Sequence, residues 1–472
     1  MAFEIKPVNI AGPSRQSRSR ALNDQKTKNF YQEVNPGGKS EFVLQSFPGQ
    51  KLFGSTTVGD DRGSHRMAGV PFGVVGESLV EIDANGAHTA VGAIPGIERC
   101  TFADDGTNLF ICTAGSVYQY NGTVVIQVTD PDIDGSNAVA ILNNQFIYTK
   151  PNLFIISDVG NGASASGLNA AQAESQPDDL VRAYVFDETV YMLGTESTEE
   201  WYNSGAGSPP FARITGQVHD TGLGALHSVA NTDNFMYWLG DDTRVYRLRS
   251  GNMQPISDIT VSNAIEGYGS ISDAVGFTFT LQGQNFYLLS FPAANRTWLY
   301  NESLGADGWS ELSSGTNDAM YKCTSFVRAY NKNLVRDKSS GELYEWSTTT
   351  YSDNGDVIQR QRQMSPIHGG LVGAPGRRLK MSGMEFVVQT GVGLITGQGE
   401  DPKMLLEYST DDSIAWKHGT WISLGRQGIY QPNVKWDKML SFKTLNIRLT
   451  ITDPVFASIH SASIKLKDGG GR

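Results

Sequence analysis

The acidic turn that begins at Asp130 is the part of the sequence closest to a metal-binding motif. Carboxylates recur at alternate positions, Asp130, Asp132 and Asp134, and Gly135 follows them. A calcium-binding loop of the EF-hand type begins in this way, with oxygen ligands at alternate positions and a glycine for the sharp bend. The twelfth position is Ile141, where such a loop needs a bidentate glutamate. We therefore interpret the segment as an ordinary Asp- and Gly-rich turn, with a metal site as the weaker alternative.

No other group of residues has the spacing of a catalytic or cofactor site. The seven histidines include no pair four residues apart, and neither a GxSxG elbow nor a GxxxxGK loop is present. His219 and His227 flank a glycine-rich turn, and we interpret them as loop residues. We predict no catalytic residue, no cofactor and no enzymatic activity.

One short segment resembles a motif of sugar-binding propellers. Residues 409–416 are similar to the Asp-box of sialidases, with Ser413 in place of the turn glycine and Ala415 in place of the threonine. In those families the box stabilises a hairpin away from the catalytic centre. A propeller that binds or hydrolyses host surface polysaccharide is therefore the alternative function.

The composition indicates a β-rich protein that does not clamp nucleic acid. Gly accounts for 52 of 472 residues, charged residues for only 18%, and the net charge is −11. Broad phosphate binding needs clustered Lys and Arg, whereas an acidic channel would let DNA slide past. The three cysteines form no disulfide framework, which favours a reducing compartment. The apolar runs are far shorter than the ~20 residues that span a bilayer, so we predict no membrane segment.

An apolar hairpin recurs seven times between residues 74 and 346, with an aromatic residue at the equivalent position in all but the first, weaker copy. The equivalent positions are Val80, Tyr118, Phe154, Trp201, Tyr246, Trp298 and Tyr344. A repeat of roughly 40 to 50 residues made of short strands without helices is typical of a β-propeller. Seven blades, or six blades preceded by a decorated segment, both fit this spacing. A β-sandwich or a solenoid is the alternative fold.

The pattern divides the chain into four parts. We predict an extended basic arm at 1–41, a six- or seven-bladed propeller at 42–354, a linker at 355–380 and a β-sandwich-like domain at 381–472. Strand-like alternation of polar and apolar residues supports the last part, most clearly from Thr444 to Thr450. Within the propeller, residues 160–180 are rich in small residues, and we expect a long exposed loop there.

The arm carries the residues that we expect to contact a partner. Arg15, Arg18 and Arg20 lie in a segment with neither helical nor strand periodicity, and Phe30 and Tyr31 follow. Such a segment cannot fold alone, so it is either a solvated tail or orders on a neighbouring subunit or on DNA. The two aromatics favour docking, because exposed they would form an apolar patch.

Several short sequence motifs in the first 200 residues resemble those of one phage protein family. They are Gly12-Pro13-Ser14, the spaced set Asn29, Tyr31 and Glu33, Gly37-Gly38-Lys39, the segment 44–49, and the segments 173–178 and 197–202. In this order they are similar to the tail hub or nozzle of short-tailed bacteriophages, the packaged-DNA stabilisation proteins. Beyond about residue 210 the agreement is in architecture and length only, so the loops that determine partner specificity are not covered.

The resemblance implies a structural role in the virion. A protein of this family would form a homohexameric ring beneath the portal and its adaptor ring, retain packaged DNA and form the exit channel. It would also seat tail spikes, fibres or needle proteins. Double-stranded DNA would pass through the lumen without sequence-specific binding, and assembly would take place in the host cytoplasm.

Overall fold

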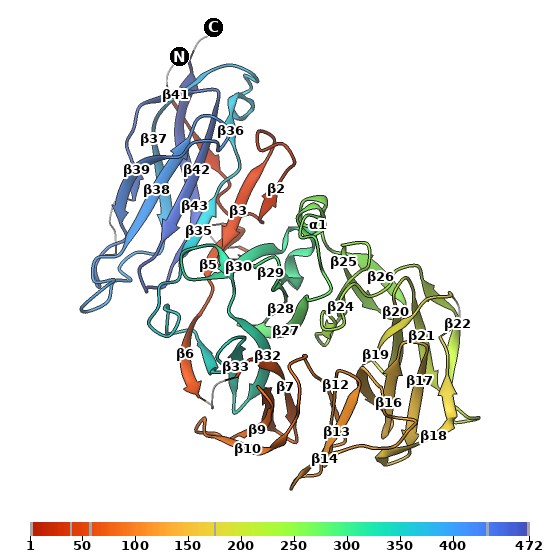
Figure 1. The fold of residues 1–472 in the computed structure, drawn as a ribbon. Coiled ribbons are helices and arrows are strands. Elements are labelled where there is room, and N and C mark those ends of the chain that lie inside the picture. The colour runs from red at the N-terminus through yellow and green to blue at the C-terminus, as the bar shows by residue number, and fades with distance from the viewer. Residues whose placement is uncertain (1–2, 38–39, 56–58, 174–175, 431–433, 470–472) are drawn as a thin grey trace.

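A computed structural model describes residues 3–37, 40–55, 59–173, 176–430 and 434–469. Gly38, Lys39, Glu174 and Ser175 lie outside these ranges. These four residues belong to the motifs that resemble the phage family. The chain is nearly all β, with 54% of its residues in strands and 4% in helices. Figure 1 shows a propeller and a sandwich, with the N-terminal strands between them.

Each of the seven hairpins expected from the repeat forms a pair of antiparallel strands. Their central aromatic and aliphatic residues are buried, because each hairpin packs on both neighbouring hairpins. The pairs are β8 (Val70–Val75) with β9 (Ser78–Ile82), β12 (Leu109–Thr113) with β13 (Ser116–Tyr120), β16 (Gln145–Lys150) with β17 (Leu153–Asp158), β20 (Thr189–Gly194) with β21 (Thr198–Asn203), β24 (Met236–Leu239) with β25 (Val245–Arg249), β28 (Gln284–Phe291) with β29 (Arg296–Asn301), and β33 (Lys332–Asp337) with β34 (Leu343–Ser347).

An inner and an outer strand complete each four-stranded unit. The inner strands are β7 (Asp61–Met67), β11 (Thr101–Asp104), β15 (Ala138–Leu142), β19 (Leu180–Phe186), β23 (Ala230–Asn231), β27 (Val275–Leu281) and β32 (Cys323–Ala329). The outer strands are β10 (His88–Ala93), β14 (Val125–Gln127), β18 (Asn161–Ala171), β22 (Phe211–His219), β26 (Asn252–Pro255), β30 (Trp309–Ser314) and β6 (Gly49–Gly54).

The propeller has six separate blades, each a four-stranded sheet of its own. The remaining quartet, β27 to β30, is part of a 12-stranded sheet that continues into the sandwich. The count of six blades is therefore confirmed. The first copy of the repeat, around Val80, is itself a blade and not a decorated entry segment, since β7 to β10 form a four-stranded sheet. The two domains share a continuous sheet.

The last blade is completed by a strand that precedes the first blade. β6 pairs antiparallel with β34, from Leu343 opposite Gly54 to Ser347 opposite Gly49. Gly49 is needed here, since a Cβ at this position would lie 2.4 Å from the carbonyl oxygen of Ser352. Closing the ring in this way leaves one fewer open sheet edge.

The C-terminal part forms a sandwich of two sheets. Its strands are β37 (Leu379–Val388), β38 (Lys403–Ser409), β39 (Lys417–Ser423), β40 (Lys435–Trp436), β41 (Leu440–Phe442), β42 (Thr444–Ile451) and β43 (Ser458–Asp468). One sheet has β43 beside β37, and the other has β38 between β42 and β39. The C-terminal β-sandwich expected from the alternating strands is confirmed.

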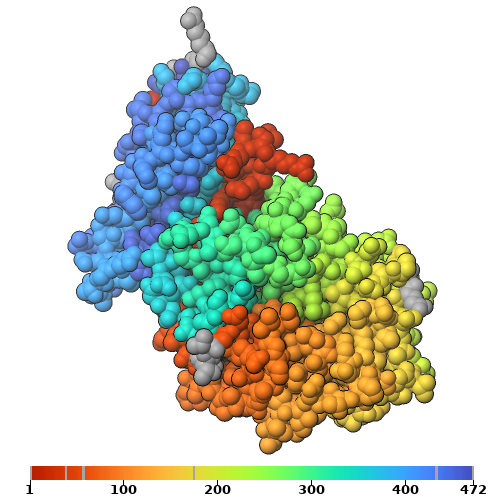
Figure 2. Space-filling model, in the orientation of Figure 1, coloured from red at the N-terminus to blue at the C-terminus, as the bar shows by residue number. Residues whose placement is uncertain are grey.

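Strands from the predicted arm and linker, together with the first strand of the segment predicted as propeller, are integral to both sheets. They are β1 (Glu4–Val8), β2 (Arg15–Gln16), β3 (Asp24–Lys28), β4 (Phe30–Val34), β5 (Phe42–Ser46), β35 (Arg360–Gln363) and β36 (Ile367–His368). β1 pairs with β43, and β3 lies between β30 and β35. Figure 2 shows the N-terminal residues between the two lobes on this face. The domain boundaries at 41, 354 and 380 stay predictions.

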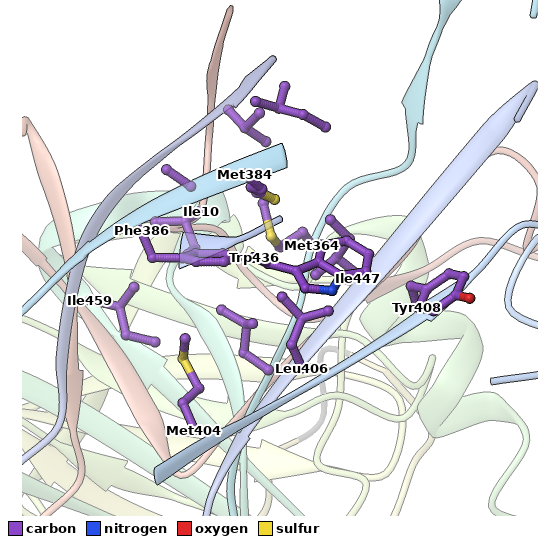
Figure 3. Close-up of a cluster of buried hydrophobic side chains, with 14 of the residues drawn as sticks. Ile10, Met364, Met384, Phe386, Met404, Leu406, Tyr408, Trp436, Ile447 and Ile459 are labelled. Carbon is purple, nitrogen blue, oxygen red and sulfur yellow. The ribbon is translucent and has the colours of Figure 1, made fainter. Parts of the chain in front are cut away.

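The sandwich core includes side chains from all of these segments. Ile10 of the arm and Met364, which follows β35, are both buried among Met384, Phe386 and Trp436 (Figure 3). Burying an aliphatic side chain of this size contributes roughly 1.5 to 3 kcal/mol. The arm is therefore held by the hydrophobic effect as well as by strand pairing.

The structure differs from the sequence expectations at two places within the propeller. Of the loop expected at 160–180, residues 161–171 form the outer strand β18, because small residues fit a sheet edge as readily as a turn. The propeller also contains a helix, α1 (Ile259–Glu266), whose first N–H groups are capped by the side chain of Asp258. Short 3-10 segments, η1 (Glu302–Asp307) and η2 (Gly369–Val372), and the short strand β31 (Ala319–Met320) complete the fold. No helix in the described ranges is long and apolar enough to cross a membrane.

Candidate functional site

Arg15 connects the arm to the propeller of its own chain. Its Nε lies 2.6 Å from a carboxylate oxygen of Asp258, and its Nη2 lies 2.8 Å from a carboxylate oxygen of Asp307. Asp258 also caps α1, so one carboxylate serves both the helix and the arm. The partner contact expected of Arg15 is thus, in the isolated chain, a contact between two parts of the same molecule.

Arg18 and Arg20 lie at the exposed tip of the hairpin formed by β2 and β3. Arg18 donates from Nη2 to the side-chain oxygen of Asn263 at 3.1 Å, and Arg20 is exposed. Leu22 on the same tip has 78% of its surface exposed. The tip therefore offers two guanidinium groups and one apolar side chain to the surroundings.

Phe30 and Tyr31 occupy two different hydrophobic cores. Successive side chains of a strand point to opposite faces, so β4 sends Phe30 into the sandwich and Tyr31 into the propeller. They are 1% and 3% exposed. The Tyr31 ring meets Phe286 edge-to-face at 5.5 Å, and its hydroxyl donates to Gln282 at 2.7 Å. These two adjacent residues fasten the domains together.

Arg362 holds the arm at the junction through a fully buried guanidinium. Its Nε donates to the carbonyl of Ile10 at 2.6 Å, and its Nη2 donates to the side-chain oxygen of Gln25 at 2.7 Å. Its Nη1 donates to the hydroxyl of Thr27 at 2.8 Å and to the carbonyls of Gly12 and Pro13, each at 3.2 Å. Burial lowers the pKa of Arg362 to about 9. The five neutral acceptors take the place of a counter-ion.

A second buried cation, Lys28, belongs to the arm and contacts the propeller. Lys28, on β3, has a side chain only 2% exposed and forms a hydrogen-bonded ion pair with Asp318. It also donates to the side-chain oxygen of Gln359 at 2.6 Å. Burial lowers the pKa of Lys28. Burial alone would raise the pKa of Asp318, but the bond from Lys28 and the charges of Lys26 and Lys28 bring it down to about 2.

The weak metal candidate at 130–134 serves as a turn. The side chain of Asp130 accepts the backbone N–H of Asp132 at 2.9 Å and that of Ala165 at 3.2 Å. Its carbonyl accepts the N–H of Asp134 at 2.8 Å. Within the described ranges, no three His, Cys, Asp or Glu residues are arranged to hold a metal ion. Asp130 therefore ties this turn to the outer strand β18.

The Asp-box-like segment also forms a local turn. Asp411 accepts the backbone N–H of Ala415 at 3.1 Å and lies within hydrogen-bond distance of the hydroxyl of Ser409. Trp416 stacks beneath the guanidinium of Arg448, whose central carbon is 4.2 Å from the ring centroid. The polar groups of residues 409–416 therefore stabilise a turn within the sandwich.

A cavity of about 370 Å³ lies along the propeller axis. Six of the seven inner strands, or the residues beside them, contribute to its lining, which includes Arg99, Arg182, His65 and His227. Arg99 is tied to the fully buried Asp61 at 3.3 Å and to the carbonyl of Thr324 at 3.2 Å. Burial lowers the pKa of His227, and the charges of Arg99 and Arg182 lower it further.

Sequence reasoning did not identify Arg99, Arg182, His227 or Arg362 as members of a site. The first three come from different blades, so only closure of the ring brings them together. Arg362 lies in a polar segment that we expected to be a linker. Residues 360–363 alternate arginine with glutamine, which is compatible with a strand. Arginine and glutamine side chains are mostly exposed in proteins, so the sequence gives no sign that this strand is buried.

Two family models match the chain in sequence order. The model for the bacteriophage P22 Gp10 β-propeller matches residues 7–351, and the model for the Gp10 β-sandwich matches residues 367–467. The chain belongs to the bacteriophage P22 Gp10 family. The Gp10 family consists of packaged-DNA stabilisation proteins, so this chain is a structural protein of a phage tail. The family resemblance noted in the first 200 residues is confirmed, and it extends over both domains.

Comparison with curated proteins gives no match. Among solved structures, the computationally designed Ika8 protein is 11% identical, with 68% of this chain and 99% of that chain covered and a TM-score of 0.39. The Pan2 WD40 domain of Neurospora crassa is 8% identical over 63% of this chain and 94% of that chain, with a TM-score of 0.42. The extracellular domain of BT4673 from B. thetaiotaomicron is 10% identical over 87% and 62%, with a TM-score of 0.44. We draw no functional argument from these similarities.

Proposed function

We propose that this Gp10-family protein is the nozzle subunit of a short-tailed phage. Six copies would form a ring beneath the portal and its adaptor ring, retain the packaged DNA and form the exit channel. The ring would also seat tail spikes, fibres or needle proteins. The observation that carries the proposal is the match of both family models, in order, to two domains that the arm fastens together.

The contacts that join the propeller to the sandwich suit a subunit that would have to resist the pressure of packaged DNA. Rigid coupling requires that the propeller and the sandwich share contacts that do not slide, and buried polar ties are specific in geometry. Arg362, Lys28 and the pair Phe30 and Tyr31 supply such ties. A hinge of exposed, flexible linker would instead let the domains move independently.

The charge of the protein suits a channel for DNA. With a net charge of −11, a ring of six subunits would repel the phosphates of a duplex. Double-stranded DNA would then pass without sequence-specific binding and without being retained along the wall. The exposed basic tip with Arg18 and Arg20 is our candidate for contact with the adaptor or with a neighbouring subunit.

The proposal is tested on particles that lack the protein. Heads packaged in a host that does not supply this chain should lose their DNA and carry no spikes or fibres, and supplying the chain in trans should restore both. Retained DNA and complete tails in its absence would refute the proposed role.

Assembly provides a second test with purified components. Mass measurement should show a ring of six copies once portal and adaptor are both present, even where the isolated chain is monomeric. A chain that remains monomeric with both components present would contradict the nozzle assignment. Release of reducing sugar from host polysaccharide would instead favour the alternative of a sugar-hydrolysing propeller.

A further inference from the structure

The axial cavity has an unusual charge for an acidic protein. Arg99 and Arg182 line it, whereas none of the described lining residues is an aspartate or a glutamate. The carboxylate of Asp61 is fully buried outside the lining and is shared between Arg99 at 3.3 Å and Arg336 at 3.9 Å. Asp104 is paired with His65 at 2.6 Å. Positive charge therefore exceeds negative charge around the cavity.

Arg182 is only partly satisfied by the protein. Its Nη1 donates to the carbonyl of Leu226 at 2.8 Å, and its guanidinium lies over the Tyr184 ring at 5.2 Å. Its Nε is buried and has no hydrogen-bond partner among the described residues. The same is true of the Nε of Arg99. Burying cationic donors without an anion is unfavourable, so such groups are normally paired.

The rest of the lining is polar and largely engaged within the protein. Ser325 donates to Asp61, Thr278 donates to the carbonyl of Asn231, and the amide of Asn231 donates to the carbonyl of Thr232 at 3.1 Å. The lining also includes Ser64 and Thr101, whose hydroxyl oxygens accept from Arg336 at 3.4 Å and from the backbone N–H of Val139 at 3.2 Å. Hydroxyls and guanidinium groups are the donors that hold phosphate and carboxylate oxygens in proteins. The volume corresponds to roughly a dozen water molecules, which is ample for one oxyanion and its hydration.

We propose that the axial cavity is a binding site for an oxyanion, a phosphate or a carboxylate group, held chiefly by Arg182. The group comes either from a free small anion or from a carboxylate-rich protein segment that enters the propeller axis. Both sources present the same chemistry to the guanidinium. The proposal concerns the isolated chain and does not depend on the nozzle assignment.

The test is calorimetric titration of the purified full-length chain at fixed ionic strength in chloride. Inorganic phosphate probes for a free anion, and a capped peptide of four aspartates probes for a protein segment. We expect one saturable site for at least one probe, and the probe that binds identifies the source. Arg182→Gln should weaken binding about tenfold or more, because a charge-assisted hydrogen bond is lost.

Two further variants keep the test decisive. Asn231→Asp adds a negative charge at the cavity while keeping the oxygen that accepts the Tyr184 hydroxyl at 2.6 Å, so it should fold and bind the probe more weakly. Arg328→Gln is the control, since Arg328 lies on the same strand, β32, as Ser325 but is exposed and outside the lining. Saturable binding of neither probe would overturn the proposal. So would binding that Asn231→Asp leaves unchanged.

Discussion

The Nε of Arg362 donates a hydrogen bond of 2.6 Å to the carbonyl oxygen of Ile10, although the two residues are 352 positions apart. Ile10 packs in the sandwich core, and Arg362 lies on the strand between β3 and β42. This bond fixes the arm where the propeller and the sandwich meet. The arm is therefore a structural part of both domains.

Replacing Arg362 with methionine should destabilise the protein by about 3 kcal/mol or more, because buried acceptors would lose their donor. Those acceptors include the carbonyls of Ile10, Gly12 and Pro13. Arg362→Lys should recover only part of the loss, since an ammonium group cannot reproduce the guanidinium fork. Urea denaturation measures the change. Arg328→Met, at an exposed position, is the control, and an Arg362→Met variant within about 0.5 kcal/mol of the wild type would contradict the prediction.

Gly49→Ala should weaken closure of the propeller. The added Cβ would lie 2.4 Å from the carbonyl oxygen of Ser352 and 2.6 Å from that of Thr350, and backbone atoms cannot move aside without strain. We expect a loss of about 1 to 3 kcal/mol in the free energy of unfolding. In Gly267→Ala, the matched control, the residue has φ −74° and the nearest atom is 3.4 Å away, so stability should hardly change. Equal stability of the two variants would argue against a tight closing strand.

The stability of the protein should fall between about pH 6.5 and pH 4 partly because of His88. Burial, and then the charge of Arg336, lower the pKa of this imidazole to about 4. The unfolded chain, with a His pKa of about 6.5, binds more protons across this window, so acid favours unfolding. His88→Gln should make the loss less steep, as measured by urea denaturation across the window. Arg328→Gln, at an exposed position, should leave the slope unchanged, and a wild-type slope retained in His88→Gln would count against this assignment.

The double variant Arg18→Ala and Arg20→Ala should impair assembly without loss of stability. Both side chains lie at an exposed hairpin tip, where Arg18 donates to Asn263 at 3.1 Å. Incorporation into particles should drop, whereas thermal unfolding of the isolated chain should not shift. Arg15→Ala is the comparison, because loss of its ion pairs with Asp258 and Asp307 should loosen the hairpin itself. Normal incorporation of the double variant would remove the contact role.

The repeat was predictable from the sequence because its signal is local. Six of the seven hairpins carry an aromatic within a few residues of the turn, so Tyr118 and Trp298 mark their blades without knowledge of the rest. The alternation from Thr444 to Thr450 indicates a sandwich strand in the same way, and β42 covers it.

The arm and the cavity were not predictable because they depend on contacts between distant segments. Phe30 and Tyr31 suggest docking but do not say onto what, and their two cores become apparent only once β4 lies between the domains. Arg182 and His227 line the same cavity only because the closed ring brings different blades together. Polar strands such as Arg360–Gln363 follow no hydrophobic pattern, since their burial depends on hydrogen bonds from the other end of the chain.

The pairing of β1 with β43 and of β6 with β34 also bears on how the molecule is made. During translation, the strands that leave the ribosome early must wait, unpaired, until their partners have been synthesised. A prematurely terminated product would keep these strand edges open and could complete neither the ring nor the sandwich. Such fragments would be exposed to host proteases. Only full-length chains could then fold completely and persist as subunits.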